Sequence, residues 1–182
     1  MTLKIKYFSF LLLFALSFGG SANAQKQSAD KNLPNFSQVN EQLYRGGQPT
    51  EAGVKKLKED FSIKTIIYLR GADERAKKEE KWAKDAGINF VNVPLKNWFG
   101  PKDEKIEKIL SLINDPENQP VFVHCKRGSD RTGTIIAVYR ITQNDYTAKQ
   151  ATKEAKEFGF GWWQFWMEDF IKDYYKDFIA KK

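Results

Sequence analysis

The stretch that decides the fold is Val121-Phe-Val-His-Cys-Lys-Arg-Gly-Ser-Asp-Arg-Thr-Gly133. Its apolar start, Val121 to Val123, predicts a buried strand, and the run from Thr134 to Ile141 has the length and spacing of a buried helix. A strand, a tight loop and a helix N-terminus in this order form an anion-binding site. Loop N–H groups converge there, and the helix dipole favours negative charge. The sequence therefore predicts a cradle for a phosphate-sized anion.

Two side chains give this cradle chemical reactivity. Cys125 lies at the base of the loop, where the helix N-terminus and Arg131 are expected to favour the nucleophilic thiolate. Arg131 can bind two phosphate oxygens through its planar guanidinium. The Thr132 hydroxyl is predicted to hydrogen-bond the sulfur, and Gly128 to adopt a positive φ that turns successive N–H groups inward. Together these groups suit phosphoryl transfer, in which the equatorial oxygens carry charge.

The motif also resembles that of a known family. His124-Cys125, five residues and Arg131-Thr132-Gly133 match the HCxxGxxR[ST]G signature, so the chain resembles the cysteine-dependent protein tyrosine phosphatase superfamily. Within it, the chain looks most like the compact dual-specificity and atypical dual-specificity phosphatases. A second segment, Asn35 to Pro49, resembles the first strand of bacterial members. The resemblance covers residues 35 to 180.

The resemblance implies a role for each residue of the loop. Cys125 would be the nucleophile that becomes a phosphocysteine, and Arg131 would bind the phosphate. His124 would tune the thiolate from behind, and Thr132 would assist the sulfur. The residues expected to contact the substrate are Lys126, Arg127, Gly128, Ser129, Thr132 and Gly133.

The general acid is the point at which this sequence departs from the family pattern. Members usually carry an aspartate where this chain has Asn97, and an amide cannot protonate the leaving oxygen. Asp130, inside the loop, ranks first as a replacement. An aspartate at this place resembles the loop of the myotubularin-type lipid phosphatases, whose general acid has been assigned there. Asp103 ranks second, since its expected role is to cap a helix, and Asn97 is expected to position the substrate only. A phosphoanhydride or an aryl phosphate would need no acid.

The substrate class stays open at this stage. Lys126 and Arg127 are either ordinary exposed loop residues or a site for a second phosphate or an acidic flank. The family acts on phosphotyrosine, phosphoinositides and inositol phosphates, so we expect a phosphorylated protein or a small phosphorylated substrate. His124 is the single histidine of the chain, so no histidine-based metal site can form, and we expect neither metal nor cofactor. A hydrogen-bonded structural histidine is the expectation for His124.

Residues 1–24 have the pattern of a secretory signal peptide, with Lys4 and Lys6, an apolar stretch and the cleavage site Ala22-Asn-Ala24. The apolar run is too short to span a membrane comfortably. We therefore expect cleavage after Ala24, a periplasmic or secreted protein of bacterial type, and no stable membrane insertion. Residues 25–34 are predicted to be flexible, and residues 35–182 to form the phosphatase domain.

Strands alternate with helices along residues 35–182, which predicts a single-domain, three-layer α/β sandwich with a mostly parallel central sheet flanked by helices, as in dual-specificity phosphatases. The loop Arg70 to Glu74 is expected at the same sheet edge as the phosphate cradle. The predicted strands are 42–45, 63–69 and 88–93. One predicted helix starts after Thr50, and three others span residues 74–85, 103–113 and 146–156.

Composition limits the other partners. The net charge is +7, or +5 without Lys4 and Lys6, and most lysines alternate with glutamates, as between Lys77 and Lys84. This pattern indicates solvated helix faces, so we expect no nucleic-acid partner, and we expect a monomer. An aromatic stripe near the C-terminus predicts core packing, with a partner- or membrane-facing patch rimmed by Trp162 and Trp163 as the alternative. The stripe comprises Trp163, Trp166, Met167, Phe170, Ile171, Tyr174 and Phe178.

The sequence thus predicts an exported phosphatase that works through a phosphocysteine without metal. Three alternatives remain. A catalytically weak phosphate-binding module is suggested by Asn97. A rhodanese-like sulfurtransferase also uses a cysteine in an anion loop, although its loop is typically shorter. An interaction protein could use the aromatic stripe instead.

Overall fold

The core of the molecule is a five-stranded sheet in the order β1-β2-β5-β3-β4. The computed structural model describes residues 30–96, 100–161 and 163–182. Strand β1 runs antiparallel to β2, and every other neighbouring pair is parallel. The mostly parallel sheet predicted from the sequence is confirmed. The strands are β1 Ser37–Asn40, β2 Leu43–Gly46, β3 Thr65–Tyr68, β4 Asn89–Asn92 and β5 Val121–His124.

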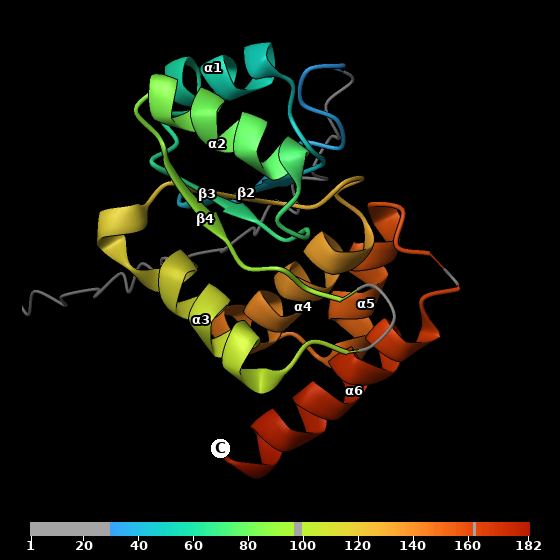
Figure 1. Ribbon diagram of the computed structural model, residues 1–182. Helices are drawn as coiled ribbons and strands as arrows, with labels where there is room; N and C mark the ends of the chain where they lie inside the picture. Colours follow the sequence, from blue (N-terminus) through green and yellow to red (C-terminus); the bar gives the residue numbers. More distant parts are fainter. Residues whose placement is uncertain (1–29, 97–99, 162) are drawn as a thin grey trace, which may run out of the picture.

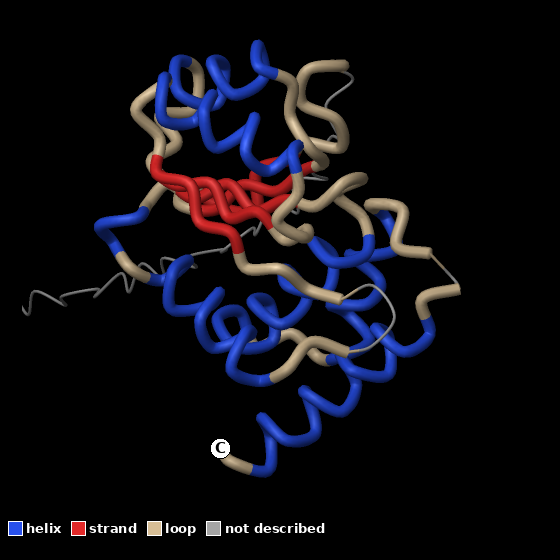
Figure 2. The backbone as a smooth tube through the Cα atoms, viewed as in Figure 1, coloured by secondary structure: helices blue, strands red, loops and turns tan. Residues whose placement is uncertain are grey.

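Helices cover both faces of this sheet and complete the predicted three layers. Helices α1 and α2 lie on one face, and α3, α4, α5 and α6 lie on the other (Figures 1 and 2). The helices are α1 Glu51–Glu59, α2 Glu74–Asp85, α3 Asp103–Asn114, α4 Asp130–Asn144, α5 Ala148–Glu157 and α6 Phe165–Ala180, with a 3₁₀ turn at Pro116–Asn118.

Each inner strand contributes apolar side chains to both layers. Ile66 and Phe122 pack into the core beneath α1 and α2, together with Leu57. Their neighbours Ile67 and Val123 pack into the core on the side of α4. Successive side chains point to opposite faces of a strand, so a run such as Val121–Val123 has to be apolar throughout.

Strand β5 lies between β2 and β3, with all three parallel. In this register His124 lies level with Gly46 of β2 and Tyr68 of β3. The segments that leave the C-terminal ends of these strands therefore meet at one edge of the sheet. Ligands of open α/β sheets bind at such an edge.

Side-chain caps set several helix starts. Thr50 accepts a hydrogen bond from the Gly53 N–H, as predicted, and Thr147 forms a capping box with Gln150. The predicted cap at Asp103 is wrong. The residue preceding α3 is Lys102, without a side-chain cap, and Asp103 is the first helical residue. A carboxylate there still interacts favourably with the helix dipole.

Helix α4 begins earlier than expected, at Asp130 rather than at Thr134. Arg131, Thr132 and Gly133 therefore lie in its first turn, not in the loop. Their polarity hides the helical pattern from the sequence. The structure instead starts the helix as soon as the chain has turned around the anion site.

The aromatic stripe of the C-terminal region packs only in part. Met167 and Ile171 are buried against α4 and α5, and Tyr174 is half-buried there. Trp163 precedes α6 and is 44% exposed, while Phe165 in the first turn is 63% exposed. Core packing is thus correct for the middle of the stripe and wrong for its beginning. Trp162 lies outside the described residues.

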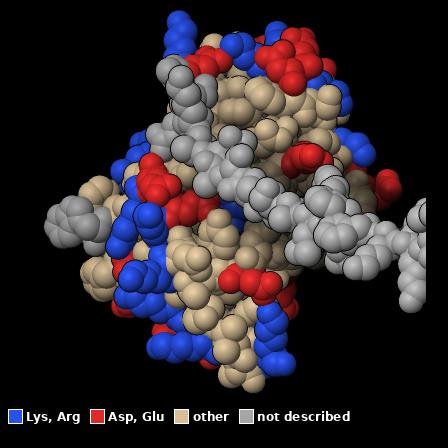
Figure 3. Space-filling model, turned by 180° about the vertical axis from the view of Figure 1, so that it is seen from behind, with Lys and Arg blue, Asp and Glu red and all other residues tan. Residues whose placement is uncertain are grey.

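Basic and acidic side chains are interspersed over the face seen in Figure 3, consistent with the solvated helix faces predicted from the alternating charges. Glu79 is the exception, because it lies within the Lys77–Lys84 run and is fully buried. Within the described ranges, none of the helices has the length and apolar character needed to cross a bilayer.

Candidate active site

The loop that joins β5 to α4, residues 125–129, is held by the N-terminal segment of the domain. Three consecutive loop carbonyls accept hydrogen bonds from it. Gln48 N–H donates to Lys126 O at 3.2 Å, Asn35 Nδ2 to Arg127 O at 3.1 Å, and Arg45 Nη2 to Gly128 O at 3.0 Å.

Because these carbonyls are drawn outward, the loop amides are left for another partner. Among the described residues, none accepts a hydrogen bond from the backbone N–H of residues 126–131. Gly128 has the predicted positive φ of 75°. Consecutive free N–H groups at the start of a fifteen-residue helix form a binding site for an anion.

Cys125 lies at the base of this cradle and is 3% exposed, among the apolar side chains of β5 and α4. Arg131 is half-buried in the first turn of α4, and its guanidinium makes no hydrogen bond or ion pair with any other described residue. A nucleophile and an unpaired arginine thus border the same set of free amides. The hydroxyl of Thr132 is fully buried and has no hydrogen-bond partner among the described residues, Cys125 included, so the hydrogen bond predicted from it to the sulfur is not formed.

Asp130 connects the loop to the segment before α6. One carboxylate oxygen, Oδ2, lies 2.5 Å from Nη2 of Arg127, and the other, Oδ1, accepts a hydrogen bond from Gly161 N–H at 3.0 Å. The Arg127 guanidinium also lies over the Trp163 ring, 5.5 Å from its centroid. Asp130 and Arg127 therefore support the loop, a role that the sequence did not reveal.

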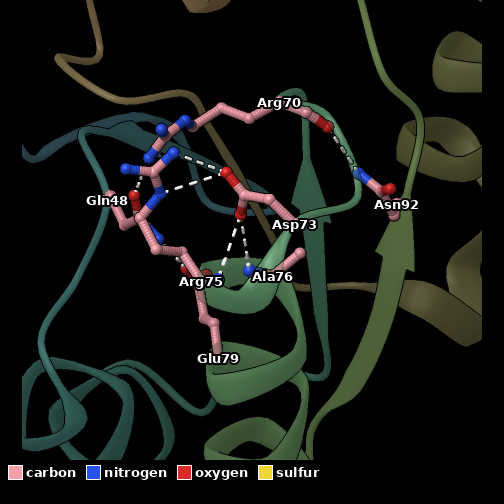
Figure 4. A network of polar contacts seen from close by, with 7 residues as sticks. All are labelled: Gln48, Arg70, Asp73, Arg75, Ala76, Glu79 and Asn92. Atoms are coloured by element: carbon pink, nitrogen blue, oxygen red, sulfur yellow. Dashed lines mark hydrogen bonds and ion pairs between the residues drawn. The ribbon is translucent and has the colours of Figure 1, made fainter.

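His124 is fully buried on the sheet face opposite Cys125. Its Nδ1 lies 3.2 Å from the carbonyl oxygen of Cys125, and its Nε2 lies 2.6 Å from Oε1 of Glu79, a distance typical of an ion pair, although the two atoms are not aligned as a hydrogen bond. Gln48 donates to the other Glu79 oxygen at 3.1 Å, and Arg70 donates to Gln48 Oε1 (Figure 4). The expectation of a structural, hydrogen-bonded His124 agrees with this geometry. The loop after β3 reaches the same edge as the cradle, as predicted.

Glu79 escaped the sequence analysis, although its position carried a signal. Ala76, Glu79 and Ala83 are the buried residues of α2 and are spaced as i, i+3 and i+7. This spacing is that of an apolar helix stripe, so a glutamate within it must face the sheet and find a partner there.

Arg45 is a second residue that the sequence analysis missed. It is fully buried in β2, and its guanidinium stacks on the Phe158 ring at 3.8 Å. Burial lowers the pKa of Arg45 to about 10, with Glu154 and Cys125 acting in the opposite direction. Arg45 therefore keeps its charge at neutral pH beneath the anion loop. An arginine between apolar strand residues on a doubly covered sheet was the available signal.

The remaining candidates lie in the loop itself, on α3 or outside the described residues. Lys126 is exposed at the rim, and Ser129 is buried where the loop joins α4. Asp103 is exposed on α3. Asn97 lies outside the described residues. Over the described ranges, no three His, Cys, Asp or Glu side chains converge as metal ligands would.

Comparison with known proteins adds the family. A sequence model of the family described as DSP-PTPase phosphatase fused to NAD+ kinase matches residues 21–172. The chain belongs to this family.

Relatives of this chain include two named phosphatases. The dual specificity protein phosphatase TpbA of Pseudomonas aeruginosa is 29% identical over 139 residues, which cover 76% of this chain and 60% of TpbA. The inositol diphosphatase SIW14 of Saccharomyces cerevisiae is 28% identical over 151 residues, or 81% of this chain and 53% of SIW14. The chain thus spans little more than half the length of these curated relatives.

A solved structure shows the same fold. The core catalytic domain of the PP-IP phosphatase SIW14 from S. cerevisiae, crystallised in complex with citrate, matches this chain with a TM-score of 0.71 and 29% sequence identity. The match covers 82% of this chain and 91% of the SIW14 domain. The fold predicted from the resemblance is confirmed.

The loop geometry predicts the effect of Gly128→Ala. An added Cβ would lie 2.4 Å from the carbonyl carbon of Gly46, and the φ of 75° strains any L side chain. We expect a loss of about 1–3 kcal/mol in the free energy of unfolding and a loss of stabilisation by inorganic phosphate. Urea denaturation with and without phosphate measures both. Gly71→Ala, with no atom within 4 Å of the added Cβ, is the matched control, and equal behaviour of the two variants would contradict the prediction.

Proposed function

We propose that this protein is a phosphatase that hydrolyses phosphate monoesters through a phosphocysteine intermediate. The observation that carries the proposal is the cradle itself. Within the part of the chain that the structure describes, the N–H groups of residues 126–131 and the guanidinium of Arg131 have no partner, and they lie with the thiol of Cys125 around one helix N-terminus. Family membership and the two named phosphatases among the relatives support it.

The proposed reaction has two steps. The Cys125 thiolate attacks phosphorus in line, so that an S–P bond forms while the P–O bond to the leaving group breaks. Arg131 and the loop amides hold the three equatorial oxygens, which carry the transition-state charge. Water then attacks the thiophosphate, releases inorganic phosphate and regenerates the thiolate. No residue in this scheme needs a metal.

The substrate is proposed to be a phosphorylated protein or a small phosphorylated compound with a good leaving group. The relatives carry names of both kinds, a dual specificity protein phosphatase and an inositol diphosphatase. The Asp130 carboxylate, the first candidate for the general acid, already accepts hydrogen bonds from Arg127 and Gly161. A phosphoanhydride or an aryl ester leaves without proton donation, which suits a site whose acid is engaged in this way. Lys126 at the rim is available for a second negative group.

Phosphate release from p-nitrophenyl phosphate by the reduced protein in EDTA tests the mechanism. We expect turnover by the wild type and a loss of about 10³-fold or more for Cys125→Ser, because the serine hydroxyl is a far weaker nucleophile near neutral pH. Rapid acid quenching should trap a phosphorylated wild-type chain. If the wild type binds phosphate but releases none, the protein is a binding module instead. Thiocyanate formation from thiosulfate would favour a sulfurtransferase.

The role of Asp130 has its own test, with aryl phosphates of increasing phenol pKa. We expect a steep fall of kcat/KM along this series in the wild type. Asp130→Asn should lower kcat/KM by less than about tenfold for every substrate in the series. Removal of a general acid, in contrast, lowers the rate by about 10²–10⁴-fold. A loss confined to poor leaving groups, together with a changed pH profile, would instead establish Asp130 as the acid.

We also propose that residues 1–24 direct export and are removed. The two lysines, the apolar stretch and Ala22-Asn-Ala24 support this proposal. Expression of the full chain in a Gram-negative host should yield a periplasmic protein whose mass corresponds to a chain starting at Gln25. Ala24→Arg should block processing, because the cleavage site requires small residues. A cytoplasmic protein of full mass in the wild type would contradict the proposal.

A further inference from the structure

A string of buried polar contacts runs from the surface to the carbonyl group of Cys125. Arg70 donates to Oε1 of Gln48, and Gln48 donates to Oε2 of Glu79 (Figure 4). Oε1 of Glu79 lies 2.6 Å from Nε2 of His124, and Nδ1 of His124 lies 3.2 Å from Cys125 O. The string connects the segments that follow β2 and β3 with helix α2 and with strand β5.

The chemistry of the partners determines which atoms hold protons. A carbonyl oxygen only accepts, so Nδ1 of His124 must carry a proton to bond Cys125 O. Gln48 uses its carbonyl oxygen for Arg70, and its amide nitrogen therefore faces Glu79 as a donor. Glu79 thus accepts from Gln48 and presents its second oxygen to Nε2. A proton on Nε2 as well makes the ring an imidazolium facing a carboxylate.

The surroundings of the His124 ring strengthen its interaction with the Glu79 carboxylate. His124 and Glu79 are both fully buried, where water screens charges weakly. The other neighbours of the ring are Phe122, stacked at 5.2 Å, and the edge of Tyr68, at 5.3 Å. Burial raises the pKa of Tyr68, so this neighbour adds no charge at neutral pH. Among the described side chains in contact with the ring, Glu79 therefore supplies the carboxylate, since the thiol of Cys125 lies on the opposite face of the sheet.

We propose that Glu79 is a positioning residue for the nucleophile, which keeps His124 doubly protonated behind Cys125 and thereby favours the thiolate. The inference rests on the proposed role of Cys125 as nucleophile. Gln48 and Arg70 hold the Glu79 carboxylate in place, and Nδ1–H of His124 fixes the carbonyl group from which the loop starts. Glu79 acts through His124 alone and contacts no substrate.

The protein offers a direct measurement, because His124 is its single histidine. In untagged protein labelled with ¹⁵N-histidine, the ring nitrogens report their own protonation without any assignment problem. We expect the spectrum of an imidazolium in the wild type at pH 7. In Glu79→Gln, which keeps the size of the side chain, we expect a neutral ring at pH 7. A neutral ring in the wild type at pH 7 would overturn the proposal.

Alkylation of Cys125 by iodoacetamide, followed by mass spectrometry, measures the consequence for the thiol. In Glu79→Gln we expect the rate at pH 6 to fall by about tenfold, which corresponds to a shift of one pH unit in thiol ionisation. Glu80→Gln, the exposed neighbour on α2, is the matched control and should react like the wild type. Equal rates in Glu79→Gln and the wild type would contradict the proposal.

A further variant and a comparison with turnover distinguish a failure of this proposal from a failure of the proposed function. Gln48→Leu removes the amide contact and leaves Glu79 in place, so it should shift the ring signals and the alkylation rate in the same direction by a smaller amount. It serves as the decisive variant if Glu79→Gln does not fold, and an unchanged spectrum would then overturn the proposal. Neither measurement requires turnover. An inactive wild type with an imidazolium and the expected alkylation would refute the phosphatase and leave the positioning role of Glu79 intact.

Discussion

The structure depends on the hydrogen bonds that hold three consecutive carbonyls of the anion loop. Lys126, Arg127 and Gly128 each direct a carbonyl to a donor that lies about eighty to ninety residues earlier in the chain. Without those donors, no hydrogen bond would orient the loop carbonyls outward and the loop amides toward a common centre. The parallel register of β2 with β5 brings the donors to this place. The sheet thus serves mainly to connect two segments that are distant in sequence.

Charges buried on both faces of β5 are the second constraint. Arg45 lies on the side of Cys125, stacked on Phe158, while Glu79 and His124 lie on the other side beneath α2. Taking these groups out of water is costly, and partners offset only part of that cost. All three lie around the end of a single strand, next to Cys125.

Some side chains at the rim of the site are engaged in contacts within the protein. Arg127 contacts Asp130 and the Trp163 ring, and Asp130 also accepts from the N–H of Gly161. The segment before α6 is therefore coupled to the loop, and its exposed Trp163 lies against Arg127. Under the proposed function, selectivity at this site is expected to come from leaving-group chemistry and from the shape of this rim, with Lys126 available for a second negative group.

The sequence by itself determined the fold class and the anion loop. Both depend on local signals, namely apolar strands, capped helices such as the one after Thr147, and a cysteine and an arginine at fixed spacing around Gly128. It did not reveal Arg45 or Glu79, because a charged residue in a strand or helix shows its partner only after the chain has folded. It also misjudged the start of the helix at Asp103 and the burial of Trp163, whose environment depends on segments elsewhere in the chain. Tertiary structure decided which polar groups are buried together, since burial and pairing depend on contacts between distant residues, whereas the signals that predict a helix, a strand or a tight loop lie in neighbouring residues.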